Sequence, residues 1–296
     1  MASNSQSLEI DLQKRSSLAV MRHLLGVESI PDAPTLLEHA MILCIDCEAY
    51  EFNHNKVTEV GLAMVSSSDF RAVQPELQGP FAENLLKKIF FYHFRVIENA
   101  HLINRRFCPG NPTKNRFGQT RFLTLSQIQD ALTSAFNWDI DPEDPGVGRC
   151  PIVLIGHALQ NDTNMLGSIG IDASILDMVV KTVDTQVLAG EVGLPSYRGH
   201  WIGLRNLCHI HGFSPLDSHT AGNDAAYTIL NAVFLAMRNE LFVDGLETAV
   251  NGLGTIQDVV DSISHESTMH IYRYGSATFC EGAGVILTFG RNATSD

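Results

Sequence analysis

Acidic side chains recur at three separate places in this chain of 296 residues. The places are Asp46-Cys47-Glu48 after an apolar run at 41–45, Asp162 after an apolar run at 151–155, and His219 with Asp224 before an apolar stretch. Side chains two apart on a strand point to the same face, so the first two carboxylates would lie side by side. Adjacent carboxylates repel each other unless a cation lies between them.

Each acid alone also has an ordinary structural explanation. Asp46 and Glu48 could be solvated acids at a strand end, and Asp162 could be a stabilising acid in the first turn of a helix. His219 could cap a helix, and Asp224 could pair with a nearby basic residue. Three such features in one chain, each next to an apolar segment, favour a common site over three unrelated explanations.

The elements that must position these residues alternate between strands and helices. Buried or half-buried strands are predicted at 41–45, 59–65, 151–155 and 182–185, and helices at 17–25, 83–94, 124–136, 162–169, 203–211 and 221–238. A hairpin is possible between 270–274 and 284–289. Such alternation indicates an α/β fold built on one mixed sheet flanked by helices.

The order and spacing of the acids resemble the DEDDh family of 3′→5′ exonucleases, the DnaQ-like or RNase T-like branch of the ribonuclease H-like superfamily. The resemblance covers about residues 41–240, with 1–40 and 241–296 as N- and C-terminal extensions. Further similar features are Glu59-Val60-Gly61, Gly156-His157, Val183-Asp184-Thr185 and the pair Leu204 and Leu207. Position 220 is Thr, and no Tyr lies four residues before Asp224, which disfavours the tyrosine branch.

The resemblance implies hydrolysis of phosphodiester bonds by two divalent metal ions, Mg²⁺ or Mn²⁺, held about 3.5–4 Å apart. The implied metal ligands are Asp46, Glu48, Asp162 and Asp224, with His219 as general base. Oxygen ligands without paired Cys or His favour these ions over zinc. Residues implied to bind the terminal nucleotide are Cys47, Ala49, Tyr50, His157 and Asn161.

Charge is distributed unevenly along the chain, whose net charge is −13. Residues 71–121 hold nine Lys or Arg and three acids, a net charge of +6, so the remainder carries −19. Aromatic residues run through this basic segment, predicted as an insert that guides a single strand toward the metals. A solvated helix face with core aromatics is an equally simple interpretation.

A narrower resemblance concerns 92–104 together with 117–120, which are similar to a fungal group of DEDDh proteins. That group includes an Argonaute-interacting exonuclease of RNA silencing and a protein linked to messenger-RNA export. The resemblance favours single-stranded RNA 3′ ends over DNA as substrate and implies a protein partner in one of those pathways. The alternatives are a catalytically silent RNA- or protein-binding module and a DNA-trimming exonuclease. A homodimer is also possible.

Composition excludes several other classes. Hydrophobic residues make up 45% of the chain, and no apolar run approaches the ~18 residues that span a bilayer. The N-terminus lacks the apolar core of a signal peptide, and six cysteines form no disulfide framework in so long a chain, so we expect an intracellular protein of the cytoplasm, the nucleus or both. No P-loop or dinucleotide-binding glycine motif is present.

Overall fold

The computed structural model describes residues 4–74, 78–171, 176–194, 201–242 and 255–269. At its centre lies one six-stranded mixed sheet with the order β4-β3-β2-β1-β5-β6. The strands are β1 (Met41–Tyr50), β2 (Asn53–Ser66), β3 (Phe90–Val96), β4 (Thr120–Leu123), β5 (Ile152–Gly156) and β6 (Val179–Asp184). β1, β2 and β3 pair antiparallel, whereas the pairs β1/β5, β5/β6 and β3/β4 are parallel.

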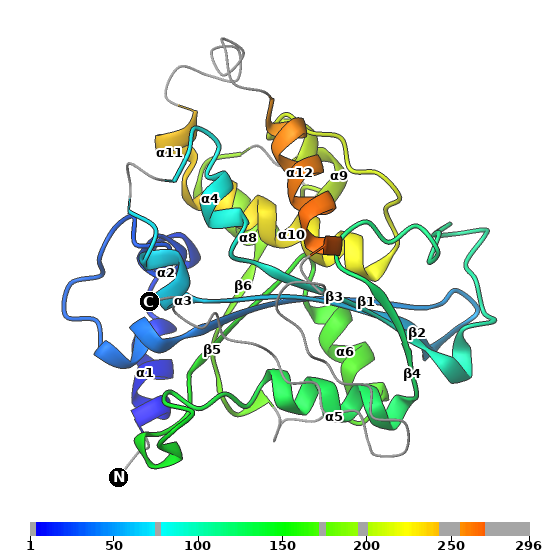
Figure 1. The fold of residues 1–296 in the computed structure, drawn as a ribbon, viewed down its shortest axis with the longest axis horizontal. Coiled ribbons are helices and arrows are strands. Elements are labelled where there is room, and N and C mark those ends of the chain that lie inside the picture. The colour runs from blue at the N-terminus through cyan, green and yellow to red at the C-terminus, as the bar shows by residue number, and fades with distance from the viewer. Residues whose placement is uncertain (1–3, 75–77, 172–175, 195–200, 243–254, 270–296) are drawn as a thin grey trace.

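Helices cover both faces of this sheet (Figure 1). The α-helices are α1 (Asn4–Leu12), α2 (Ser17–Leu24), α3 (Ser67–Arg71), α4 (Glu83–Leu86), α5 (Leu125–Ala135), α6 (Gln160–Ser168), α8 (Thr185–Glu191), α9 (Leu204–Ile210), α10 (Ala221–Ala236), α11 (Arg238–Leu241) and α12 (Ile256–Met269). Short 3₁₀ turns are η1 (Thr35–His39), η3 (Ile97–Asn99) and η4 (Pro145–Val147). The predicted mixed sheet flanked by helices is confirmed, and it is consistent with a ribonuclease H-like fold.

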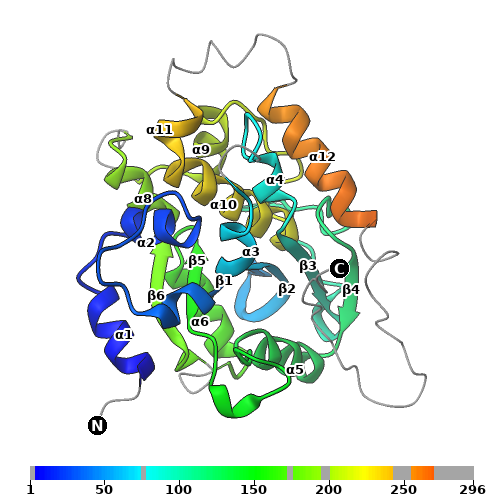
Figure 2. The same ribbon diagram turned by 60° about the vertical axis from the view of Figure 1, so that its left-hand side comes forward.

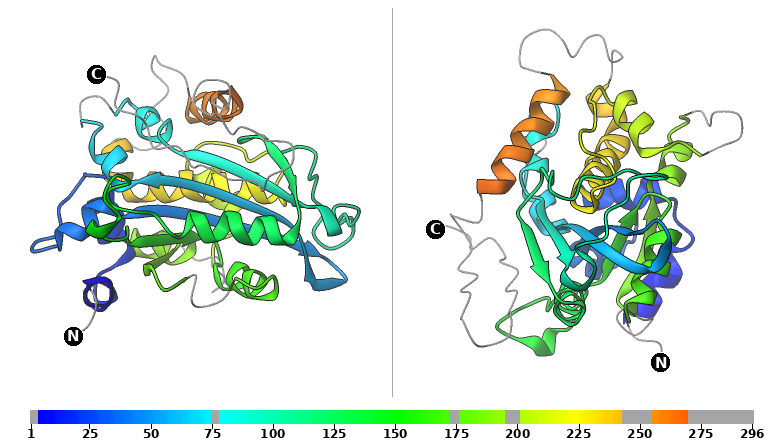
Figure 3. Two further views of the ribbon diagram at one scale, coloured as in Figure 1. Left: turned by 60° about the horizontal axis from the view of Figure 1, so that its bottom comes forward. Right: turned by 90° about the vertical axis from the view of Figure 1, so that its right-hand side faces the viewer.

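The sheet separates two hydrophobic cores, which explains the unbroken apolar sequence of β1. Even-numbered side chains such as Ile42 and Cys44 pack in the core that contains α10. Odd-numbered ones such as Leu43 and Cys47 pack in the core that contains α5 and α6. Every residue of α10 is buried, so this helix is the centre of its layer (Figure 3). Cys44 and Cys47 therefore face opposite cores, as expected for residues three apart on a strand.

The two extensions pack on the α/β unit in different places (Figure 2). In the N-terminal extension, α1 and α2 contact β6, and α2 also contacts α8 and α10. Leu8, Leu12, Val20 and Leu24 are buried in the core that contains α10. In the C-terminal extension, α12 contacts α4. Within the described residues, no helix is both long and apolar enough to cross a membrane.

Two expectations about the elements require correction or fall outside the structure. The predicted helix at 83–94 is wrong beyond its first turn, since α4 ends at Leu86 and Phe90–Val96 is strand β3. Aromatic and β-branched residues favour a strand there, and the sheet supplies its hydrogen-bonding partner on β2. β3 and β4 thus make parts of the basic segment integral to the sheet. The possible hairpin at 270–274 and 284–289 lies outside the described residues.

Gly61 lets β2 approach the N-terminal end of α10. A Cβ added at this position would lie 1.9 Å from the Ala221 carbonyl oxygen. We expect Gly61→Ala to lower the free energy of unfolding by about 1–3 kcal/mol, because helix and strand would have to separate. Gly167→Ala is the control, since nothing lies within 4 Å of its added Cβ and alanine favours a helix. Denaturant unfolding measures both, and equal effects of the two substitutions would contradict this account.

Candidate metal-binding active site

The first two acids lie on β1 at the carboxyl end of the strand. Asp46 and Glu48 share the face that packs toward α10, since their neighbours Ile42 and Cys44 do so. The Sγ of Cys44 donates to the Ala225 carbonyl oxygen at 3.3 Å, which brings β1 close to α10. β5 runs parallel to β1, so both strands end at the same edge of the sheet. Sites commonly form at such an edge, beyond the carboxyl ends of parallel strands.

Asp162 reaches the same edge from the turn between β5 and α6. It lies in the first turn of α6, and its Oδ1 accepts a hydrogen bond from the Cys47 backbone N–H at 2.8 Å. The turn is held by Asp184 at the end of β6, whose carboxylate accepts hydrogen bonds from the backbone N–H groups of Ala158 and Leu159. Ala158 has a positive φ of 58°. Asp184 therefore fixes the strained turn that presents Asp162.

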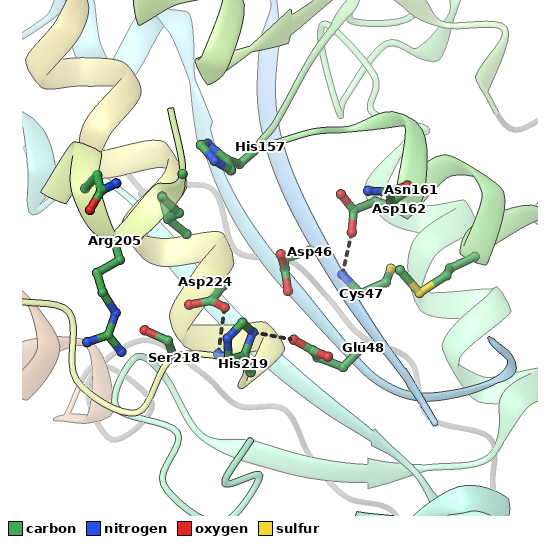
Figure 4. Close-up of a pocket in the computed structure, with 14 residues that line it drawn as sticks. Asp46, Cys47, Glu48, His157, Asn161, Asp162, Arg205, Ser218, His219 and Asp224 are labelled. Atoms are coloured by element: carbon green, nitrogen blue, oxygen red, sulfur yellow. Dashed lines mark hydrogen bonds and ion pairs between the residues drawn. The ribbon is translucent and has the colours of Figure 1, made fainter. Parts of the chain in front are cut away.

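His219 and Asp224 come from the start of α10. The Asp224 Oδ2 accepts the backbone N–H of His219 at 2.8 Å, and His219 has a φ of 60°. The Nδ1 of His219 lies 3.8 Å from Glu48 Oε1 (Figure 4). The same nitrogen lies 3.1 Å from Cys108 Sγ. A left-handed backbone in a residue other than glycine is costly, so these contacts hold His219 in a strained position beside the acids.

The loop that contains Cys108 wraps the start of α10. Asn111 accepts a hydrogen bond from the Thr220 hydroxyl through its carbonyl oxygen. Asn223 accepts the backbone N–H of Arg116 and donates to the carbonyl oxygen of Lys114. A Cβ added at Gly110 would lie 2.1 Å from the His219 carbonyl oxygen, so only glycine allows this approach. The basic segment is thereby tied to the helix that presents His219 and Asp224.

These side chains line one open cleft of about 560 Å³. Its lining residues are Asp46, Cys47, Glu48, His157, Asn161, Asp162, Met165, Gly203, Leu204, Arg205, Asn206, Ser218, His219 and Asp224. The structure brings together all five predicted catalytic residues and three of the five predicted to bind substrate. The other two, Ala49 and Tyr50, do not belong to this lining.

Burial and repulsion from neighbouring carboxylates raise the pKa values of all four acids. Burial and then the Asp162 carboxylate raise the pKa of Asp46 well above its usual range. Burial and then Asp224 raise the pKa of Glu48 to about 8. For Asp162 and Asp224, burial raises the pKa to about 7, against the effect of their backbone N–H donors. Four carboxylates in one cleft therefore resist ionising together.

The same acids have the properties of ligands for a divalent cation. Among the described residues, the Asp46 Oδ2 and the Asp224 Oδ1 are buried without a hydrogen-bond partner. Ligand atoms of Glu48, His219 and Asp224 lie within 4.8 Å of one another. Carboxylate oxygens are the ligands that Mg²⁺ and Mn²⁺ prefer, and the positive charge of a cation would relieve the repulsion. The site therefore fits such a cation.

A fifth carboxylate, Glu59 on β2, lies behind these four. It pairs opposite Glu48 in the β1/β2 register and is 4% exposed. Its Oε2 lies 2.9 Å from His93 Nε2 and accepts the Ala221 backbone N–H at 3.3 Å, while His93 Nδ1 lies 2.9 Å from the Thr120 hydroxyl. Glu59 thus connects β2 to the first turn of α10 and positions Asp224 through the backbone.

Sequence reasoning did not assign a role to Arg205, Cys108 or Glu59. Arg205 lies on α9 and lines the cleft, and its charge contributes to lowering the pKa of His219 after burial does so. Its position after Leu204 in a segment already compared with the family was a usable signal. Cys108 offered no such signal, because it lies 111 residues from His219 in the sequence. The sequence predicts a strand at Glu59, but only the register between β1 and β2 shows that Glu59 lies beside Glu48.

Comparison with known families agrees with this geometry. Residues 41–235, about two thirds of the chain, match the DEDDh family model described as "DNA polymerase III subunit epsilon-like, C-terminal domain". The matched region contains β1, β5, α6 and α10, which carry the five predicted catalytic residues. It ends at the second-last residue of α10.

Three fungal relatives are also similar. An uncharacterized protein of Saccharomyces cerevisiae is 28% identical over 236 residues, covering 72% of this chain and 45% of the relative. "Good for full DBP5 activity protein 2" of S. cerevisiae is 23% identical over 74% of this chain and 39% of its own length. An uncharacterized nucleolar protein of Schizosaccharomyces pombe is 24% identical over 63% of this chain and 65% of its own length. The match thus spans less than half of either S. cerevisiae protein.

The raised pKa values predict how stability depends on pH without metal. The folded protein holds protons that the unfolded chain has released above about pH 4.5, so raising the pH from about 5 to 8 should lower the free energy of unfolding by several kcal/mol, since each pKa unit of one group contributes about 1.4 kcal/mol. Asp46→Asn should reduce this loss because it removes one carboxylate charge, whereas the exposed Asp130→Asn should not. Thermal unfolding in EDTA at several pH values measures how stability depends on pH. The same dependence in wild type and Asp46→Asn would contradict repulsion between the carboxylates.

Proposed function

Because this chain belongs to the DEDDh exonuclease family, we propose that it is a metal-dependent 3′→5′ exonuclease that hydrolyses single-stranded nucleic acid, with RNA preferred over DNA. The observation that carries the proposal is the cleft itself. It gathers two buried carboxylates, two half-buried ones and a histidine from three distant parts of the chain, and two of the carboxylate oxygens lack a partner among the described residues. Without a cation such a cluster destabilises the fold, so a role in metal-dependent catalysis explains why these acids lie together.

The preference for RNA rests on a narrower resemblance and on the names of similar proteins. The narrower resemblance of residues 92–104 and 117–120 is to a fungal group with roles in RNA metabolism, and the three similar relatives are fungal. One of those relatives is named as a nucleolar protein, and another for the activity of DBP5. These names favour RNA and a nuclear location, and leave a protein partner in messenger-RNA export or RNA silencing as the expected context.

The four acids share one task in the proposed reaction, which is to hold the metal ions. Asp46, Glu48, Asp162 and Asp224 would hold Mg²⁺ or Mn²⁺, which activate water and stabilise charge on the scissile phosphate. Asp162 is oriented by the Cys47 N–H, and Asp224 by the His219 N–H. These donors fix one oxygen of each carboxylate and leave the other for a ligand bond. The backbone thus sets the direction of both side chains before any cation binds.

His219 is suited to accept the proton of the attacking water. Burial and then the Arg205 charge lower its pKa, so its imidazole is neutral at pH 7. Its Nδ1 faces the Glu48 carboxylate and the Cys108 thiol, which burial keeps protonated by raising its pKa to about 11. The Cys108 thiol lies within hydrogen-bond distance of Nδ1, whereas Glu48 Oε1 at 3.8 Å does not, and the tautomer of the ring decides which nitrogen accepts the proton. Arg205 adds a positive side chain to the lining for the phosphate.

The proposal predicts a metal-dependent ladder from 5′-labelled single-stranded RNA and DNA of one sequence. Wild type in Mg²⁺ or Mn²⁺ should shorten both from the 3′ end, RNA faster, and EDTA should stop the reaction. Asp46→Asn should abolish cleavage while Asp130→Asn retains it, because only the first removes a ligand. Cleavage by Asp46→Asn at the wild-type rate would reject the site. A preference for DNA would favour the DNA-trimming alternative, and RNA binding without cleavage would favour a silent binding module.

His219→Ala separates proton transfer from metal binding. Removing a general base should lower kcat by about 10²–10⁴-fold, because water must then lose its proton unaided. The carboxylates remain, so we expect Mn²⁺ to raise the melting temperature of both wild type and His219→Ala. A kcat within a few fold of wild type would remove His219 from the reaction. Loss of the Mn²⁺ effect would instead make it a ligand.

A further inference from the structure

Aromatic rings gather on the surface at the tip of the β1–β2 hairpin. Phe52 and Phe107 are 58% and 67% exposed, and their ring centroids lie 5.9 Å apart in an edge-to-face arrangement. Tyr50 lies behind Phe52 at 5.4 Å, and the guanidinium of Arg106 lies 5.0 Å from the Phe107 ring centre. We call Phe52 and Phe107 the aromatic platform. Two large exposed rings in contact leave apolar surface available to a ligand.

Hydrogen bonds through Glu51 and Asn104 fix the platform in place. The Glu51 carboxylate accepts hydrogen bonds from the backbone N–H groups of Arg105, Arg106 and Phe107 at 2.8–3.2 Å. Asn104 accepts the Glu51 N–H and donates to the Ala49 carbonyl oxygen, both at 2.8 Å. The loop that carries Phe107 is therefore strapped to the hairpin that carries Phe52. A preorganised surface loses less conformational entropy when it binds a ligand.

The platform adjoins the side of the cleft where Glu48 and His219 lie. Phe52 follows Glu48 by four residues, a span of at most about 14 Å of extended chain. Phe107 directly precedes Cys108, whose Sγ lies 3.1 Å from His219 Nδ1. A strand whose 3′-terminal nucleotide occupies the cleft therefore reaches the platform with the nucleotides just upstream. Neither ring belongs to the cleft lining, so the platform is a separate surface.

Charge next to the platform favours a polyanion. Arg105 and Arg106 are exposed, and in the part of the chain that the structure describes neither forms an ion pair. Among the described residues, three other basic residues of the segment 71–121 form ion pairs, which are Arg71 with Glu38, Lys87 with Glu266 and Arg116 with Asp217. On a protein of net charge −13, two unpaired cations beside exposed rings match a backbone of phosphates with stackable bases.

From these contacts we infer that the aromatic platform binds the nucleotides upstream of the scissile bond in a single strand. Phe52 and Phe107 stack on bases, and Arg105 and Arg106 neutralise the adjoining phosphates. Stacking has little sequence preference, since every base has a flat apolar face. The platform therefore makes the enzyme favour strands of several nucleotides over dinucleotides. The inference rests on the proposed function and names the substrate contacts of that same site.

The test combines Phe52→Ala with Phe107→Ala and compares a long substrate with a minimal one. The long substrate is an eight-nucleotide oligouridylate, and the minimal one a nitrophenyl ester of uridine monophosphate, which fills only the terminal site. The double variant should raise KM for the octamer about 10–100-fold, with kcat and ester hydrolysis unchanged. Phe122→Ala is the matched control, since Phe122 is also 58% exposed but lies on β4. Equal loss with both substrates, or an octamer KM within twofold of wild type, would overturn the inference.

Measuring octamer binding to the inactive Asp46→Asn variant separates the role of the platform from catalysis. Fluorescence anisotropy of the labelled octamer on Asp46→Asn should show 10–100-fold weaker binding when both rings are removed. Arg105→Ala with Arg106→Ala should reduce the salt dependence of binding, because fewer counterions are released. If wild type cleaves neither substrate, the proposed function fails, while the binding result still decides the platform. Octamer binding that does not change without the rings would overturn the inference and favour a protein partner there.

Discussion

The structure depends on placing four carboxylates in one cleft against the repulsion between neighbouring carboxylates. Burial and neighbouring charge raise the pKa of Glu48 to about 8 and those of Asp162 and Asp224 to about 7. The described hydrogen bonds leave one oxygen of Asp46 and one of Asp224 unpartnered. A divalent cation would stabilise these carboxylates in their ionised form, so a cluster that weakens the metal-free fold is compatible with a metal-binding site.

The rest of the molecule holds those acids where the cation needs them. β1 presents two of them through the alternation of a strand buried on both faces, and the buried helix α10 lies close to the neighbouring strand β2 at Gly61. Asp184 fixes the turn before Asp162, and Glu59 fixes the first turn of α10. The supporting groups are themselves acidic and bind backbone N–H groups. The four acids at the centre therefore repel one another, whereas Asp184 and Glu59 around them are stabilised by hydrogen bonds from backbone N–H groups.

Much of this organisation could be predicted from the sequence, because local patterns carry it. The apolar runs before Asp46 and Asp162 specify strands ending at one sheet edge, and the small and apolar residues around Asp224 specify a buried helix. The stretch at 83–94 could not be resolved in this way, since its helical pattern competes with aromatic residues that only the edge of β2 pairs into a strand. The platform was equally out of reach. Phe52 and Phe107 lie 55 positions apart, and the strap from Glu51 that joins them is a tertiary contact.

The most direct measurement is a calorimetric titration of Mn²⁺ into the wild-type chain at pH 7, repeated in buffers of different ionisation enthalpy. Carboxylates with pKa values near 7 and 8 must lose protons to become ligands, so binding should release protons into the buffer. Asp46→Asn should weaken the binding and release fewer protons, while Asp130→Asn should match the wild type. No Mn²⁺ binding, or binding without proton release, would contradict the claim that these carboxylates form a metal centre.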